Sequence, residues 1–93
     1  MNVVLGQIVY SKAGRDEGKI FLITGFIDTN YVYISDGDLR RVENPKKKKI
    51  KHLVITENII DTIAQKISTG SKITNADIRK ALVESKGSVE ADE

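Results

Sequence analysis

The chain has 93 residues, of which 40% are apolar and 30% are charged, with a formal net charge of +2 and no cysteine. This length fits one domain with a modest core, and the apolar fraction excludes an intrinsically disordered chain. Disulfides and cysteine metal sites are excluded, and the longest apolar run, residues 20–23, is far shorter than the ~20 residues that span a bilayer.

Short apolar runs separated by turn residues predict β-strands in the first part of the chain. We expect strands at residues 7–12, 18–27 and 31–35, a short strand at 39–43 that Pro45 ends, and a candidate fifth strand at 50–54. The dipeptide Asp36-Gly37 predicts a two-residue hairpin turn, because both turn positions need a positive φ. This spacing favours a small antiparallel barrel.

The apolar period becomes helical after residue 55. Thr56 is expected to cap a helix over residues 57–68, in which Ile59, Ile63 and Ile67 share one stripe. Gly70 is expected to end that helix, because glycine commonly follows the last helical turn.

A second helix is expected to begin near Thr74 and to end near Ser85, with Thr74 and Asp77 forming an approximate capping box. The residues after it have nothing to bury. The predicted organisation is therefore α+β: a barrel at residues 1–55, a helical hairpin packed on it at 56–86, and a mobile tail at 87–93.

Charge is distributed unevenly along the chain. Residues 1–52 carry ten basic and six acidic residues, whereas residues 53–93 carry five and seven. Five of the six residues from 46 to 51 are lysines. A run of charge is usually a solvated face, but these lysines closely follow Arg40-Arg41 and repel one another unless anions lie nearby, which favours binding to phosphates. The candidate RNA-binding residues are Lys12, Arg15, Lys19, Arg40, Arg41, Lys46, Lys47, Lys48, Lys49 and Lys51.

The loop between Gly14 and Gly18 superficially resembles a P-loop. It is one residue too short, Ile20 replaces the magnesium-binding hydroxyl, and two acids in the loop would repel a nucleotide phosphate. Nucleotide hydrolysis is therefore not expected. Two interpretations remain open: a hairpin loop whose glycines permit unusual φ angles, or a loop whose flanking Lys12, Arg15 and Lys19 contact RNA phosphates.

The remaining candidate residues are few. The three tyrosines can stack on bases, and Tyr31 with Tyr33 shares one strand face, but a place in the barrel core is at least as plausible. Phe21 and Phe26 are expected in the core. His52 is alone, and the chain has no nucleophile with a base, so we expect no enzyme activity, cofactor, metal or small-molecule substrate.

Gly6, Val9, the loop ending at Gly18 and the aliphatic strand after it resemble the KOW motif of ribosomal proteins and of transcription-elongation factors of the NusG type. Residues 6–53 are similar to the large-subunit ribosomal protein of the L-fourteen-e type, and more so to small bacterial KOW-domain RNA-binding proteins. Residues 72–79 resemble the tail of those bacterial proteins. The chain lacks the longer basic extensions common in ribosomal proteins.

This resemblance implies an SH3-like barrel and binding to structured ribosomal RNA, with ribosomal proteins as further candidate partners. It also implies a ribosomal or ribosome-associated protein of the cytoplasm. The first ten residues agree, because they lack the basic start and long apolar core of a signal peptide. The alternative is a protein-interaction module of the transcription or translation machinery, in which the stripe of Ile59, Ile63 and Ile67 faces a partner.

Overall fold

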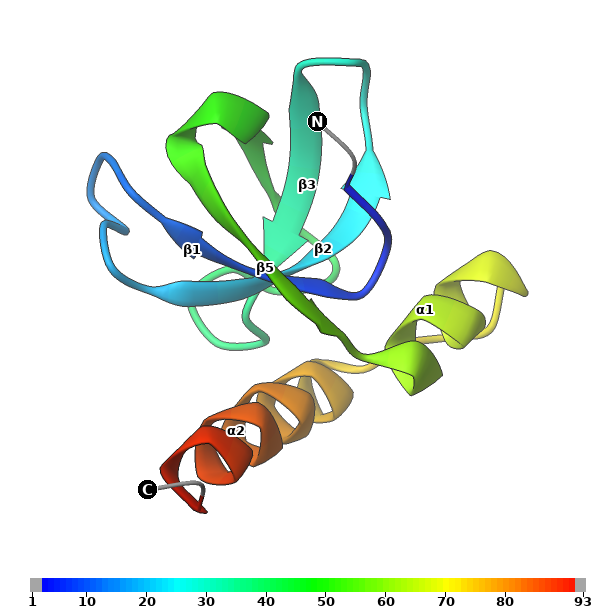
Figure 1. The fold of residues 1–93 in the computed structure, drawn as a ribbon. Helices are drawn as coiled ribbons and strands as arrows, with labels where there is room; N and C mark the ends of the chain where they lie inside the picture. The colour runs from blue at the N-terminus through cyan, green and yellow to red at the C-terminus, as the bar shows by residue number, and fades with distance from the viewer. Residues whose placement is uncertain (1–2, 92–93) are drawn as a thin grey trace.

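The computed structural model describes the backbone of residues 3–91 and the side chains of residues 3–85. The chain is a small α+β protein in which an antiparallel sheet precedes two helices (Figure 1). None of the helices in this part of the chain is long and apolar enough to cross a membrane. The elements are β1 (Gln7–Ser11), β2 (Ile20–Phe26), β3 (Tyr31–Ser35), β4 (Lys46–Lys49), the 3-10 helix η1 (Ile50–His52), β5 (Leu53–Ile59), α1 (Asp61–Ser68) and α2 (Asn75–Ala91).

The five strands form one sheet in the order β4-β3-β2-β1-β5. The strands β1 to β4 follow one another as antiparallel neighbours, while β5 returns to pair with β1. Val9 therefore lies opposite both Phe21 on β2 and Ile55 on β5. This order places β4 and β5 at the two edges of the sheet.

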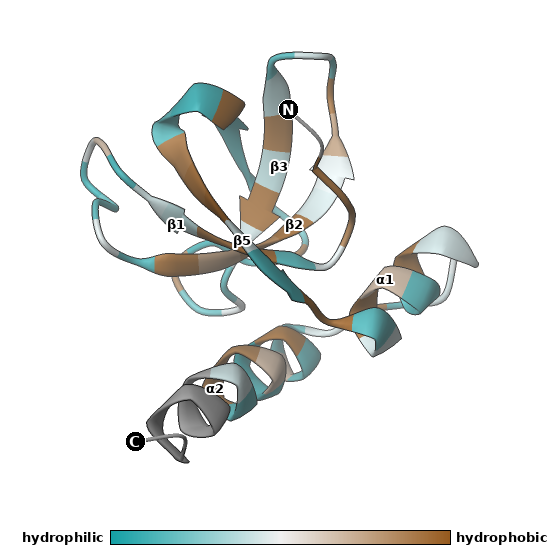
Figure 2. Cartoon of the chain, viewed as in Figure 1, coloured by the Kyte–Doolittle hydropathy of each residue, from teal (hydrophilic) through white to brown (hydrophobic). Residues whose placement is uncertain are grey.

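The sheet is buried on both faces. Successive side chains of a strand point to opposite sides, so Val9 and Phe21 join one apolar cluster while their neighbours Ile8 and Leu22 join another. The curled sheet encloses the first cluster, and the helices cover the second (Figure 2). The inner cluster contains Val9, Phe21, Ile23, Val32, Ile34, Ile50 and Leu53, and the outer cluster contains Ile8, Leu22, Ile63, Ile78, Ala81 and Leu82.

Helix α1 follows β5 directly and meets the backbone at Gly6. The Ile60 N–H donates to the Gly6 carbonyl at 2.9 Å. A Cβ at position 6 would lie 2.9 Å from the Ile60 oxygen and 3.0 Å from the Ala64 nitrogen, and Gly6 has a φ of +79°. Glycine is required here for both the conformation and the close approach of the helix.

Helix α2 begins with the predicted capping box. The Asp77 N–H donates to Thr74 Oγ1 at 3.1 Å, and the Thr74 N–H donates to Asp77 Oδ2 at 3.0 Å. The hydrogen bond from the Thr74 N–H to the carboxylate is the first cause that lowers the pKa of Asp77. Lys66 of α1 lies 3.4 Å from the same carboxylate, and Asn75 Oδ1 accepts the Val42 N–H at 2.8 Å. The start of α2 is thus tied to both α1 and the loop between β3 and β4.

The strand predicted at residues 39–43 was wrong. Asp36 Oδ1 accepts the N–H groups of Asp38 and Arg40 at 2.9 and 2.8 Å, which folds this segment into a compact loop. The two-residue hairpin was wrong as well, because β3 and β4 are joined by residues 36–45 and only Gly37 of the predicted turn has a positive φ. The fourth strand instead begins directly after Pro45 and consists of the lysines.

The boundary between strands and helices also differs from the prediction. Residues 50–52 form η1, and β5 extends to Ile59. Thr56 caps no helix, because its hydroxyl donates to the Ile8 carbonyl at 2.6 Å across the sheet, and α1 begins only at Asp61. Helix α2 continues past Ser85 to Ala91 over part of the expected tail, whose residues 92–93 lie outside the described residues.

The expected closed barrel is not confirmed, because β4 and β5 do not pair with each other within residues 3–91 and the sheet stays open. Phe26 was predicted in the core but is 51% exposed. It lies at the end of β2, past a register irregularity between Ile23 and Gly25. This irregularity brings Phe26 opposite Val32 of the inner cluster, but Phe26 is the last residue of β2, so its ring is not covered.

The contact between Gly37 and α2 gives a stability prediction. Gly37 has a φ of +78°, and a Cβ there would collide with the Asn75 carbonyl and the Arg79 side chain. Gly18 has a φ of +82° but open space around it. We expect Gly18→Ala to cost about 1–2 kcal/mol from its φ alone. Gly37→Ala should cost roughly 1–3 kcal/mol more, because the start of α2 must move.

Urea unfolding of both variants measures the difference. Equal losses of unfolding free energy for the two alanine variants would show that α2 does not pack closely on this loop.

Candidate nucleic-acid interface

Residues 46–49, here called the lysine strip, form β4, an edge strand of the sheet. Its residues lie opposite β3 in the pairs Lys46 with Ile34, Lys47 with Tyr33, Lys48 with Val32 and Lys49 with Tyr31. Lysines on an edge strand hinder pairing with the strands of other molecules, which is a sufficient structural reason for their presence. Pairing with β3 fixes the backbone of this strand, so what the lysines can contact depends on where their side chains point.

The lysines alternate between the two faces of the sheet. Lys47 and Lys49 lie on the same face as Tyr31, with their Nζ atoms 4.5 and 5.7 Å from the centroid of its ring. Such cation–π contacts hold an ammonium in place without neutralising it. Lys46 and Lys48 lie on the other face, where Lys48 Nζ donates to the Ala13 carbonyl at 3.0 Å.

The charges of four lysines act on His52, which lies where η1 meets the end of β1. The Lys12 N–H donates to the His52 carbonyl at 2.9 Å, which continues the ladder between β1 and β5. The pKa of His52 is lowered first by desolvation and then by the positive charges of the nearby lysines. These lysines, here called the basic cluster, are Lys12, Lys48, Lys49 and Lys51.

The loop between β1 and β2 is a hairpin closed by its own backbone. The N–H groups of Glu17, Gly18 and Lys19 donate to carbonyls of Gly14, Ser11 and Asp16 at 3.2, 2.7 and 2.9 Å. These donors are occupied and cannot cradle a phosphate as those of a P-loop do. Arg15 and Lys19 are exposed on this loop, so any contact with phosphate comes from their side chains.

Arg40 is committed to an internal ion pair. Its guanidinium contacts Asp16 Oδ2 through Nε at 3.0 Å and Nη2 at 2.9 Å, and only 8% of the Asp16 side chain is exposed. Sequence reasoning missed this pair, although an acid within a basic loop was a signal that could have suggested it. Arg40 therefore positions the loop between β1 and β2 and is not a free cation.

Arg41 lies in a different electrostatic environment from the basic cluster. It is exposed and acts with Lys72 on Glu43, whose pKa is lowered mainly by a hydrogen bond from Asn75. Asn75 Nδ2 donates to Glu43 Oε1 at 2.8 Å. The structure thus separates the adjacent residues Arg40 and Arg41, one joined to the β1–β2 loop and one beside the start of α2.

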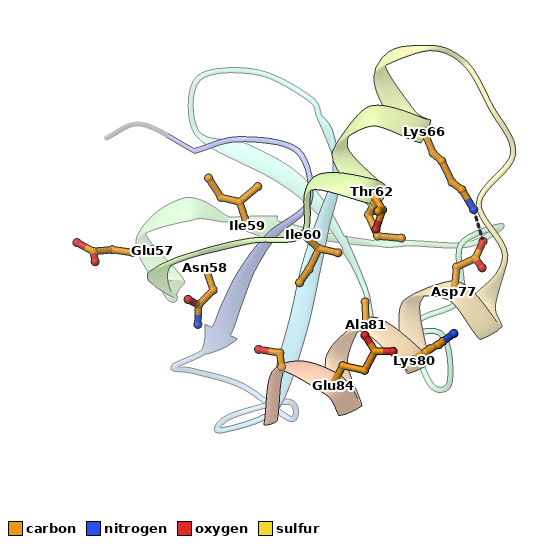
Figure 3. Close-up of a pocket in the computed structure, with 12 residues that line it drawn as sticks. Glu57, Asn58, Ile59, Ile60, Thr62, Lys66, Asp77, Lys80, Ala81 and Glu84 are labelled. Atoms are coloured by element: carbon orange, nitrogen blue, oxygen red, sulfur yellow. Dashed lines mark hydrogen bonds and ion pairs between the residues drawn. The ribbon is translucent and has the colours of Figure 1, made fainter. Parts of the chain in front are cut away.

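A groove of about 820 Å³ lies between the end of β5, α1 and α2 (Figure 3). Glu57 and Asn58 line it from the strand, and Lys80 and Glu84 from α2. Its charged residues are the carboxylates Glu57, Asp77 and Glu84 with the ammonium groups of Lys66 and Lys80, so it is not a cationic surface. In the described part of the chain, no group of three His, Asp or Glu side chains could hold a metal ion.

No protein-family model matches the chain. A protein of Bacillus subtilis (strain 168), named "Putative ribosome-binding protein YbzG", is similar to it. The two are 28% identical over 72 residues, which cover 77% of this chain and 97% of that protein. The similarity therefore extends over nearly the whole of the relative. The name of the relative refers to the ribosome, and this chain has a cationic edge strand.

The neighbouring arginines give a matched pair of variants. Arg40→Ala leaves the Asp16 carboxylate buried without its partner, so we expect a loss of about 1–3 kcal/mol in the free energy of unfolding. Arg41→Ala removes an exposed charge and should change it by less than about 0.5 kcal/mol. Chemical denaturation at neutral pH measures both, and a loss for Arg41→Ala as large as that for Arg40→Ala would contradict this assignment.

His52 provides a titration that reports on the basic cluster. Its pKa lies below the ordinary value of 6.5, so the folded protein binds fewer protons than the unfolded chain just below pH 6.5. The contribution of His52 to stability is therefore present above pH 6.5 and decreases as the pH falls below it. Lys51→Gln should raise the pKa of His52 without fully restoring it, because desolvation is the larger cause.

Titration of the His52 ring protons by NMR measures this pKa in both proteins. An unchanged pKa in the Lys51→Gln variant would show that Lys51 does not face His52.

Proposed function

We propose that this chain is an RNA-binding protein of the KOW type that associates with the ribosome through structured ribosomal RNA. The observation that carries the proposal is the basic cluster, whose lysines come from β4, from η1 and from the residue that follows β1 and bonds to His52, and whose charges all act on His52. The name of the similar Bacillus subtilis protein supports the ribosome as partner. A ribosome-associated protein acts in the cytoplasm, which is the location we propose.

The sheet supports an SH3-like architecture. Five short strands in the order β4-β3-β2-β1-β5 curl around one apolar cluster, and a 3-10 turn precedes the last strand. This arrangement is typical of a small, partly open barrel. We propose that the KOW segment corresponds to β1, its loop and β2, where the sequence resemblance is strongest.

Binding in this proposal is electrostatic. Lysines act on phosphates as point charges and do not read sequence, so they position the protein on RNA of suitable shape. The deep groove of A-form RNA excludes side chains, which favours contact with phosphates and the shallow groove. The exposed Arg15, Lys19 and Lys47 extend the surface of the basic cluster, whereas Arg40 supports it from within. We propose a binding role and no catalytic one.

A protein partner is the second candidate, but it needs different residues from those expected. Ile63 is 3% exposed and packs with Leu22 in the outer cluster, and Ile67 packs against the same cluster. These two residues of the predicted stripe therefore face the sheet, whereas Ile59 does not. The groove between α1 and α2, with Ile59 43% exposed at its edge, is the observation that favours a ribosomal protein or another protein as partner.

Sedimentation of a cell extract through a density gradient tests the proposal. We expect the protein to migrate with large ribosomal subunits at low salt and to be released by a high-salt wash, because counterions compete with lysine–phosphate contacts. Migration only at the top of the gradient at low salt would contradict ribosome association.

Matched charge variants test whether the basic cluster makes the contact. Lys12→Gln/Lys51→Gln and Lys72→Gln/Lys80→Gln remove the same charge from exposed positions, the first pair at the cluster and the second on the helical side. With a structured ribosomal RNA fragment, the first variant should lower the slope of log affinity against log salt by about 1.4–1.8. The second should keep the wild-type slope, and equal effects would exclude the cluster as the specific contact.

A further inference from the structure

The outer face of β3 and β4 carries two tyrosines in different environments. Lys47 and Lys49 hold their ammonium groups over the ring of Tyr31. In the described part of the chain no such cation covers Tyr33, which is 39% exposed although Lys47 is its partner across the strands. Tyr31 therefore positions two cations, and Tyr33 presents an uncovered ring beside them.

The ring of Tyr33 is seated against the sheet. Gly25 is its partner on β2, and a Cβ at Gly25 would lie 3.3 Å from Tyr33 Cδ2. The ring thus occupies space that any other residue at position 25 would fill in part. The Cδ2 edge of the ring thus lies close to the Gly25 backbone, which limits its movement on that side, while 39% of the residue stays exposed to a ligand.

Tyr33 also lines a hollow of about 290 Å³ between the sheet and the end of α1. Its walls are mainly apolar, with Val42 and Pro45 on the sheet side and Ile67 and Ile73 on the helical side. A volume near the lower end of small-molecule pockets, ~300 Å³, suits a ring-sized group and not a large ligand. None of its lining residues is acidic, unlike the groove between α1 and α2.

We propose that this hollow receives one unpaired base of an RNA strand, stacked on Tyr33, while the adjoining phosphates lie on Lys47 and Lys49. The inference rests on the proposed RNA binding and adds to it a preference for RNA with an unpaired nucleotide beside a helix. An aromatic ring stacks on any base, and the lysines held by Tyr31 supply the backbone contact. The apolar walls and hydroxyls of the hollow fit a planar base better than a free phosphate.

Binding of fluorescently labelled RNA to the full chain tests this site. The probes are a single-stranded oligouridylate of about ten nucleotides, within the usual range for small domains, and a perfectly paired RNA hairpin whose loop is replaced by a linker without bases. Tyr33→Leu should weaken single-strand binding roughly 5- to 100-fold, which corresponds to the loss of one stacked base. Hairpin binding should stay within about twofold of wild type, and Tyr33→Phe should retain both affinities because it keeps the ring.

Phe26→Leu is the matched control, because it removes an exposed aromatic ring at the end of β2, outside the residues that line the hollow. It should leave both affinities unchanged. Wild-type single-strand binding by Tyr33→Leu, or an equal loss on both RNAs, would overturn the site. Binding of the hairpin but not of the single strand by the wild-type protein would overturn this inference alone. Binding of neither RNA would overturn the proposed function as well.

Discussion

The architecture depends on covering a sheet that is apolar on both faces with a chain of only 93 residues. Curling of the sheet buries one face, and two helices bury the other over β1 and β2. Each fully buried Leu, Ile or Phe contributes roughly 1.5–3 kcal/mol, so neither cover is dispensable in a domain of this size. The helices do not fully cover the outer corner of β3 and β4, and there Tyr33 and Lys47 are exposed.

The cationic side chains fall into two groups, one used inside the protein and one at its surface. Arg40, with its fixed fork of donors, is used inside the protein to hold Asp16. The lysines of β4, whose ammonium groups remain strongly hydrated, stay at the surface. A guanidinium suits a buried carboxylate, whereas ammonium groups on flexible stems adapt to phosphates of varied position. The arginine thus gives structural support, and the lysines make the proposed contact with RNA.

Local chemistry was sufficient to predict some elements and not others. The alternation of apolar residues identified β1, β2 and β3, and Thr74 with Asp77 identified the start of α2. The strand β4 was missed because lysine has a low strand propensity and only pairing with β3 makes this segment extended. Thr56 was assigned as a cap because its hydroxyl had no visible partner in the sequence, whereas folding supplies the Ile8 carbonyl.

The candidate site was predictable to a similar extent. The lysines of the basic cluster were all among the predicted residues, since charge density is visible in the sequence. The roles of Arg40 and Arg41 were not separable, because Asp16, the partner of Arg40, lies far away along the chain. The sequence also could not predict that the ring of Tyr31 is covered and that of Tyr33 is not, because this depends on the register of β3 against β4.

The pairing of β5 with β1 has a consequence for how the chain folds. The strands β1 to β4 are joined by local connections, but β1 gains its second neighbour only when residues 53–59 reach it. Ordering the chain across that separation carries a loop-closure entropy that local hairpins avoid. During synthesis the first four strands can therefore pair early, while the final strand and the helices that follow it lock the domain only after residues 53–91 have emerged.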